Sequence, residues 1–248
     1  MSDKTAIGWT DATINLWWGC VEVSPGCDHC YARVLAKRFG REVWGTHAPR
    51  YFTKSGPGLA YKLQKQAEKE GKRIRAFVQS MSDIAEILPA NHSDRNRMDD
   101  VRAEFFDVTV PACPLVDFQL LTKRVGNYHK ILPEKLPPNL WLGISVVNQE
   151  EADRDLPKLR VLPGKVHWVS YEPMLGPVTM MPRQIDWVVL GGESGPGHRP
   201  MDPAWLRESV AELKHWDVAV FVKQDSGMKD GQQGRIPGEL WKLKEFPA

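Results

Sequence analysis

The run Leu140-Trp141-Leu142-Gly143-Ile144-Ser145 is short and apolar up to its last residue. A segment with so few polar positions has no solvent-facing side, so it is typical of a parallel strand that is buried on both faces. A weaker strand candidate, Ile14–Trp18, lies near the start of the chain. Five further runs are nearly all apolar: Ala76–Ser80, Phe118–Thr122, Val166–Ser170, Trp187–Leu190 and Val218–Val222.

Helical patterns alternate with these runs. Asp202 and Pro203 fit the N-cap and the first position of a helix that runs to about His215. Strand–helix alternation predicts an α/β fold, a partial or closed (β/α) barrel of about seven parallel strands. The other predicted helices are Cys30–Phe39, Tyr61–Lys69, Asn96–Val108 and Asn148–Leu159.

The expected organisation is one barrel-like domain over residues 1–226, followed by a C-terminal tail, 227–248, packed on it. The domain would carry a cysteine loop at 19–32 and a basic insertion at 40–75, in which Trp44–Gly58 reads as a long loop. No signal peptide and no apolar run long enough for a membrane span are visible. We therefore expect a cytoplasmic protein without membrane contact, in which cysteines stay reduced.

The formal net charge is only +2, yet the segment Arg33–Arg75 holds twelve Lys and Arg against three Asp and Glu. Such a local excess favours contact with a phosphate backbone, so DNA or RNA is a candidate partner of this segment. A solvated helical face with counter-charges from elsewhere in the fold is the alternative. The oligomeric state is not indicated.

Three of the four cysteines, Cys20, Cys27 and Cys30, fall within eleven residues at the spacing C-x6-C-x2-C. Two thiolates at C-x2-C reach one metal centre from a tight turn, and Pro25-Gly26 supplies a turn towards Cys20. Three thiolates on a [4Fe–4S] cluster leave one iron open to an amine and a carboxylate, as S-adenosylmethionine provides. We therefore predict an iron–sulfur cluster.

A structural zinc site is the rival interpretation, and it needs a fourth ligand. His29, His47 and Cys113 are the available side chains, although His29 sits between two of the ligands. Cys113 precedes a predicted strand and is expected to be a core or surface thiol. A disulfide is disfavoured by the compartment and by the odd number of cysteines in the loop.

Polar residues follow nearly every predicted strand, at the edge where sites form in barrels and open α/β sheets. Glu193, Glu172 and Lys223 are the catalytic candidates, and Lys123 and Arg124 suit a carboxylate or phosphate on a substrate. The alternative is that these residues are polar only because the loops that follow strands are exposed to solvent. The remaining polar or glycine positions at these ends are Ser80, Asp83, Ser145, Gly191 and Gly192.

The cysteine loop after a first strand resembles the radical S-adenosylmethionine superfamily, with the spore photoproduct lyase branch as the comparison. More narrowly, the chain is similar to a phage-associated, uncharacterised family of three-cysteine proteins. The motifs that carry this resemblance are Gly8–Thr13, Gly26–Ala32, Ser80–Asp83, Leu121–Arg124, Trp141–Ser145, Glu172–Pro177 and Gly191–Gly197.

This resemblance implies a radical-type barrel and an enzyme, a lyase or transferase, that uses an external electron donor in a bacterial host's cytoplasm. It implies S-adenosylmethionine contacts at Tyr31, Ser80, Asp83, Ser145 and Gly191-Gly192-Glu193. The sequence departs from the superfamily in the six-residue first gap, in His29 before the third cysteine, and in a Gly-Gly-Glu stretch placed four strands late. A non-catalytic or redox-sensing iron–sulfur protein and a zinc-stabilised binding domain stay open as alternatives.

Overall fold

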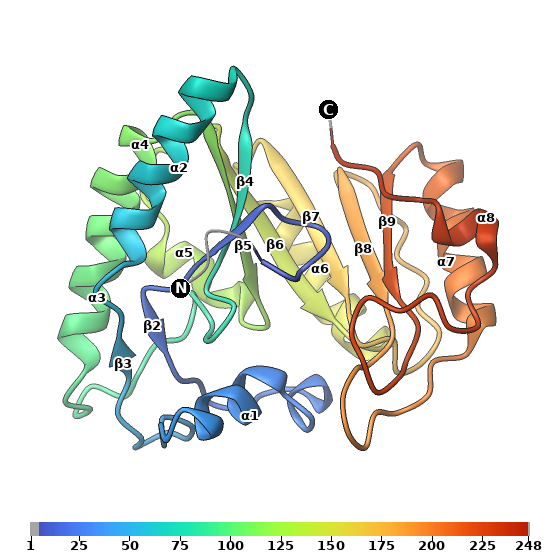
Figure 1. Ribbon diagram of the computed structural model, residues 1–248, viewed down its shortest axis with the longest axis horizontal. Helices are drawn as coiled ribbons and strands as arrows, with labels where there is room; N and C mark the ends of the chain where they lie inside the picture. Colours follow the sequence, from blue (N-terminus) through green and yellow to red (C-terminus); the bar gives the residue numbers. More distant parts are fainter. Residues whose placement is uncertain (1–4, 248) are drawn as a thin grey trace. The chain divides into compact units, whose positions relative to one another are not determined.

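The structure is a computed structural model and describes residues 5–247. It confirms the predicted α/β class with a seven-stranded parallel sheet in the order β1-β4-β5-β6-β7-β8-β9 (Figure 1). In this order β1 and β9 are the edge strands, so the described sheet is open, as in a partial barrel. No helix within the described residues is long and apolar enough to cross a bilayer.

The chain divides into two compact units. Among the described residues, the first comprises 5–6, 10–23 and 30–141, and the second comprises 7–9, 24–29 and 142–247.

The first unit contains three complete strands of the large sheet and a separate antiparallel pair. The large-sheet strands are β1 (Ala12–Ile14), β4 (Ile74–Val78) and β5 (Val116–Thr122), and the pair is β2 (Trp17–Trp18) with β3 (Tyr51–Phe52). Its helices are α1 (Tyr31–Arg38), α2 (Gly56–Glu70), α3 (Arg95–Glu104), a π-helical turn (Phe105–Thr109), α4 (Val110–Ala112) and α5 (Tyr128–Ile131).

The predicted first strand, Ile14–Trp18, is wrong in its bounds. The chain leaves the large sheet after Ile14, because the Gln79 side chain accepts a hydrogen bond from Leu16 N at 2.7 Å where a strand ladder would continue. Leu16 O instead accepts from Thr53 N at 2.9 Å, which starts the β2–β3 pair. The expected loop Trp44–Gly58 therefore contains β3, and α2 begins at Gly56 rather than Tyr61.

The second unit holds most of β6 (Leu140–Val146) and the last three strands, β7 (Val166–Tyr171), β8 (Trp187–Gly191) and β9 (Ala219–Gln224). Every residue of β6, β7 and β8 is buried, which confirms the interpretation of these runs as two-sided parallel strands. The helices are α6 (Gln149–Arg160), α7 (Pro203–His215) and α8 (Gly238–Trp241).

An indole cluster forms part of the core of the second unit. The Trp168 ring lies 5.1 Å from the centroids of both Trp9 and Trp187, and all three side chains are buried. The C-terminal stretch packs against the same strands, since Trp187 Nε1 donates to Glu245 O at 2.9 Å and Val222 N donates to Leu243 O at 2.9 Å. Aromatic packing of this kind contributes beyond the area it buries.

The N-cap of α7 supplies a first test. The Asp202 carboxylate accepts a hydrogen bond from Ala204 N at 2.8 Å, as the sequence predicts. Asp202→Ala should lower the free energy of unfolding by about 1 kcal/mol, whereas Asp202→Asn, which keeps the acceptor, should change it little. Urea unfolding followed by circular dichroism measures both, and an Asn variant as unstable as the Ala variant would contradict the capping role.

Candidate cysteine-loop site

The cysteine loop is built from a capped turn followed directly by a helix. Ser24 Oγ accepts from Gly26 N at 3.0 Å and caps the 3-10 turn Pro25–Cys27, and α1 begins at the residue after Cys30. Cys20, Cys27 and Cys30 form no disulfide and lie at partly exposed positions. Cys113 likewise forms no disulfide and is fully buried, so it is a core thiol.

In the first unit an ion pair lies beside Cys20. Arg124 Nη1 is 3.6 Å from Cys20 Sγ and 2.7 Å from Asp83 Oδ2. Asp83 also accepts from Thr122 Oγ1 at 2.7 Å and from Lys123 N at 3.2 Å. Burial raises the pKa of the Cys20 thiol, and the Arg124 guanidinium opposes that rise. Arg124 thus places a fixed positive charge next to the first sulfur.

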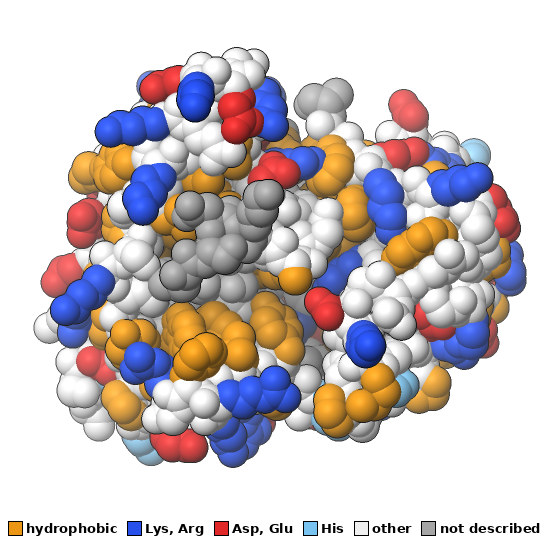
Figure 2. All heavy atoms as spheres, in the orientation of Figure 1, with side chains coloured by type: hydrophobic (Ala, Val, Ile, Leu, Met, Phe, Trp, Pro, Cys, Tyr) orange, Lys and Arg blue, Asp and Glu red, His pale blue; other side chains and the backbone are white. Residues whose placement is uncertain are grey.

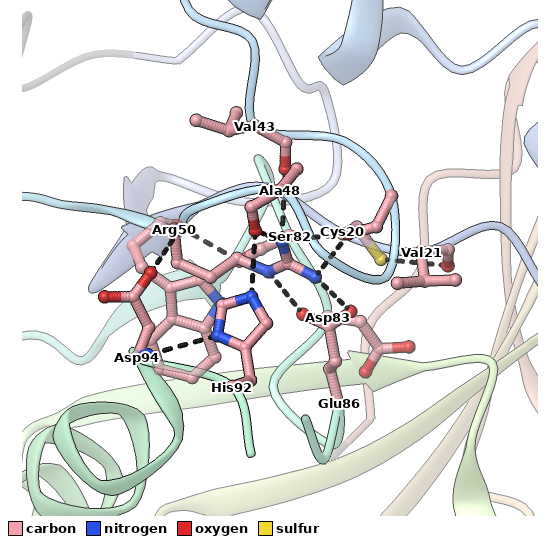
Figure 3. A network of polar contacts seen from close by, with 12 residues as sticks. Cys20, Val21, Val43, Ala48, Arg50, Ser82, Asp83, Glu86, His92 and Asp94 are labelled. Atoms are coloured by element: carbon pink, nitrogen blue, oxygen red, sulfur yellow. Dashed lines mark hydrogen bonds and ion pairs between the residues drawn. The ribbon is translucent and has the colours of Figure 1, made fainter. Parts of the chain in front are cut away.

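A fully buried arginine, Arg50, fixes the chain that packs on Cys20 (Figure 3). Its guanidinium makes two 2.9 Å hydrogen bonds to the Glu86 carboxylate and donates to the carbonyls of Val43, Gly45 and Ala48. Gly45 N in turn donates to Cys20 O at 3.0 Å. Arg50 therefore ties the loop after α1 to the backbone of the first cysteine.

Gly19 allows this close packing. Its φ is +112°, and a Cβ at this position would lie 2.3 Å from Val43 O. Backbone cannot give way as a flexible side-chain end can, so only glycine fits immediately before Cys20.

Three of the predicted cofactor contacts, Tyr31, Ser80 and Asp83, also lie in the first unit. Tyr31, which follows Cys30, donates from its hydroxyl to Ser80 O at 2.7 Å. Ser80 Oγ accepts from Asn15 Nδ2 at 3.0 Å. Together with Asp83, these side chains line the ends of β1 and β4 with hydrogen-bonding groups that already have protein partners.

In the second unit Glu193 joins the cysteine loop to the Gly-Gly-Glu stretch. Glu193 Oε2 lies 2.9 Å from His29 Nδ1 and accepts from Arg199 N at 2.8 Å and from Arg199 Nε at 3.0 Å. Arg199 also donates to Pro25 O at 2.9 Å and to Asp28 Oδ2 at 3.0 Å. The turn that carries Cys27 is thus held from a segment about 170 residues away, and we call this set the Glu193 clamp.

Glycine precedes Glu193 for a packing reason. A Cβ on Gly192 would lie 2.3 Å from Ser226 N, so the two backbones are in direct contact. Gly191 is less constrained, and its nearest neighbours are the side chains of Gln224 and Glu172. The role that the structure gives Gly192 is close backbone approach, in addition to any ligand it contacts.

The other two catalytic candidates form an ion pair. Lys223 Nζ, on β9, lies 2.5 Å from Glu172 Oε2, which follows β7 across a cis peptide bond to Pro173. Ser145 Oγ, on β6, donates to Glu172 O at 3.2 Å. Three strand ends of the second unit therefore contribute to one polar cluster, as sequence reasoning predicts for this edge.

The donor set can be compared with the metal centres proposed from the sequence. Within residues 5–247, no three His, Cys, Asp or Glu side chains converge closely enough to hold one metal ion. Cys20, Cys27 and Cys30 supply thiolates, the donor type of both an iron–sulfur cluster and a structural zinc site.

Sequence reasoning missed the residues that hold this loop in place. Arg50 and Arg199 were not singled out, and His29 was considered only as a metal ligand. Arg199 stands just after the Gly191–Gly197 motif, and that position was the available signal. For Arg50 the sequence offered no signal, because no motif near it marks a buried ion pair.

The buried Arg50–Glu86 pair generates a stability prediction. Arg50→Met should lower the free energy of unfolding by roughly 3–5 kcal/mol, because it leaves the Glu86 carboxylate buried and uncompensated. The double variant Arg50→Met/Glu86→Met removes both charges and should recover part of that loss. Chemical denaturation measures the free energy of unfolding of both variants. A double variant that is less stable than Arg50→Met alone would contradict this account.

The Glu193 clamp generates a pH prediction. Burial raises the pKa of Glu193, but hydrogen bonds from Arg199 and His29 outweigh it and hold the pKa at about 2. An unfolded glutamate titrates near pH ~4.3, so the clamp stabilises the fold fully above that pH and loses its contribution as the pH falls towards 2.

The stability difference between wild type and Glu193→Gln should therefore be constant above about pH 5 and shrink below about pH 4. Urea unfolding at a series of pH values measures it, with Glu208→Gln on an exposed part of α7 as the matched control. A difference that grows on acidification would contradict the assignment.

Comparisons with known proteins place the chain in a family. Curated proteins and solved structures gave no significant match. Residues 4–241 match the family described as "Protein of unknown function (DUF5131)". That match spans the strands, the cysteine loop, the Glu193 clamp and the Glu172–Lys223 pair, and the chain therefore belongs to the DUF5131 family.

Proposed function

We propose that this protein is an iron–sulfur enzyme in which Cys20, Cys27 and Cys30 bind a [4Fe–4S] cluster and leave one iron open for S-adenosylmethionine. The observation that carries the proposal is a set of three partly exposed cysteines, none of them in a disulfide, within eleven residues of one loop. Chain connectivity keeps such thiols near one another, and the count of three leaves the fourth cluster position without a protein ligand.

The surroundings of the thiols support a metal centre rather than three unrelated cysteines. Arg124 faces Cys20 Sγ, and the Glu193 clamp holds the turn that carries Cys27. Positive charge and hydrogen bonds near sulfur ligands are among the groups that tune a cluster. Two separate arginines, Arg124 and Arg199, contact the two parts of the cysteine loop. A surface loop without a ligand does not need such contacts.

Together, a reduced cluster and S-adenosylmethionine supply one-electron cleavage of a sulfonium carbon–sulfur bond, with an external donor providing the electron. Tyr31, Ser80, Asp83, Ser145, Gly191, Gly192 and Glu193 are the proposed cofactor contacts by resemblance. Within the protein, Glu193 positions the cysteine loop through His29, and Glu172 and Lys223 remain the proposed acid–base pair. An ion pair of this kind can hold or pass a proton at Lys223 Nζ.

The proposed partner is nucleic acid, bound through the basic segment 33–75. Lys123 and Arg124 are the proposed substrate contacts, although Arg124 is also paired with Asp83. Support for the partner comes from the charge of the segment and from the comparison with the repair-lyase branch.

Anaerobic purification tests the cluster. The wild type should be brown and contain about four iron and four sulfide per chain. Cys20→Ala, Cys27→Ala and Cys30→Ala should each lose most of this iron, while Cys113→Ala, at a buried free thiol outside the loop, should keep it. Colourless protein with one zinc would contradict the proposal and favour a zinc-stabilised domain.

Cofactor chemistry needs a second readout on the same samples. Added S-adenosylmethionine should change the electron paramagnetic resonance spectrum of the reduced protein, and dithionite should yield 5′-deoxyadenosine in chromatography. An intact cluster with neither response would remove the enzymatic part and leave a non-catalytic or redox-sensing iron–sulfur protein.

A further inference from the structure

The short β2–β3 ribbon concentrates aromatic side chains. Trp17 pairs with Phe52 and Trp18 pairs with Tyr51, so all four residues of the ribbon are aromatic. Phe39, at the end of α1, packs edge-on against Trp18 with ring centroids 5.8 Å apart. Trp17 is buried, whereas Phe39 is 64% exposed and Tyr51 is 37% exposed. The outer part of the ribbon is therefore an accessible aromatic surface.

Arginines lie over these rings. The Arg41 guanidinium carbon is 3.2 Å from the centroid of Tyr51 and 5.7 Å from that of Trp18, and the Arg97 guanidinium carbon is 4.1 Å from the centroid of Phe52. Neither arginine has a carboxylate within ion-pair distance among the described residues. By contrast, Arg33 of the same basic segment pairs with Glu22. Arg41 and Arg97 thus keep their charge and hydrogen-bond donors available.

Further positive charge borders this surface. Lys37, Arg38 and Lys54 are exposed and close in sequence to the aromatic residues, and Glu42 is the one acidic residue among positions 37–54. Figure 2 shows hydrophobic side chains gathered over the region of β2 and α1, with Lys and Arg side chains beside them. Side chains alternate between the two faces of a strand, so Trp18 and Tyr51 share one face of the ribbon while Trp17 and Phe52 share the other. We call Trp18, Phe39, Tyr51 and Arg41 the aromatic–arginine platform; Phe52 and Arg97 lie on the opposite face.

We propose that this platform binds single-stranded nucleic acid. Aromatic rings and guanidinium planes stack on unpaired bases, and unpaired arginine N–H groups donate to phosphate oxygens. Bases inside a duplex are already stacked on one another, so their faces are not accessible to protein side chains. The chemistry that fits the platform is a phosphodiester strand with splayed bases, of DNA or RNA.

This inference rests on the nucleic-acid part of the proposed function and makes it specific. It moves the contact from the whole of segment 33–75 to one face of the β2–β3 ribbon and Arg41. β2 leads directly through Gly19 to Cys20, so a base on the platform would lie on the segment that enters the cysteine loop. A protein partner is the other occupant that Arg and aromatic residues can attract, and it is an outcome of the test.

Fluorescence anisotropy on the full-length protein tests the proposal. The probes are one labelled sequence as single-stranded DNA, single-stranded RNA and duplex DNA, titrated at several salt concentrations. The wild type should bind at least one single strand more than tenfold more tightly than the duplex. The DNA and RNA arms identify which strand it prefers.

Substitutions separate the contribution of base stacking to single-strand binding from the contribution of charge. Arg41→Ala and Tyr51→Ala should each weaken single-strand binding by roughly 5- to 100-fold, as expected for the loss of one stacking contact. Arg41→Ala should also reduce the salt slope by about 1, whereas Arg41→Lys should keep the slope and lose the affinity. The matched controls are Arg207→Ala, at an exposed position on α7, and Trp216→Ala, an exposed aromatic residue outside segment 33–75 that also has an arginine, Arg183, over its ring. Thermal unfolding checks that each variant folds.

Equal binding of duplex and single strand, absence of binding, or platform variants within twofold of the controls would overturn the proposal, and the last two results would favour a protein partner. Iron content is measured on the same samples. Intact iron without strand discrimination would defeat only this inference, whereas strand discrimination in a protein that never holds iron would defeat only the cluster.

Discussion

A buried charge that must be fully satisfied governs the part of the structure around Cys20. Arg50 has no contact with solvent, so its guanidinium needs a partner for its charge and acceptors for its hydrogens. Glu86 supplies the charge, and three carbonyls of the loop between Val43 and Ala48 supply acceptors. This requirement fixes a loop that has little regular secondary structure of its own. It also explains why the backbone before Cys20 can approach so closely that only Gly19 fits.

The same device recurs at the other part of the cysteine loop. Arg199 reaches the turn before Cys27 through a carbonyl and a carboxylate, just as Arg50 and Arg124 reach the chain around Cys20. Each arginine comes from a segment that is distant in sequence or from an irregular loop, and each is anchored by an acid: Glu86, Asp83 or Glu193. A loop held by charged, directional contacts keeps its thiols partly exposed while its backbone stays in place. An apolar core around the loop would fix it equally well but would bury the sulfurs.

Much of the fold could be predicted from the sequence, because a strand that is buried on both faces is recognisable as a short run of mostly apolar residues. The runs that became β5, β6, β7 and β8 are nearly all apolar, and their existence and type were predicted correctly. The first strand was wrong, because its end is set by the Gln79 side chain, which is 63 residues away from Leu16. The cysteine loop and the polar strand ends were visible as motifs. Their partners were not, since ion pairs such as Arg50–Glu86 and Arg199–Glu193 leave no periodic pattern in a single sequence.

The indole cluster of the second unit has an optical consequence. Trp9, Trp168 and Trp187 are buried with centroids 5.1 to 6.0 Å apart, and transition dipoles at such separations couple. Coupled, immobilised indoles give near-ultraviolet circular dichroism that depends on their mutual orientation, and that signal vanishes when side-chain packing is lost. The second unit therefore carries an intrinsic chromophore for its own tertiary order, at wavelengths separate from the visible absorption of any iron–sulfur centre.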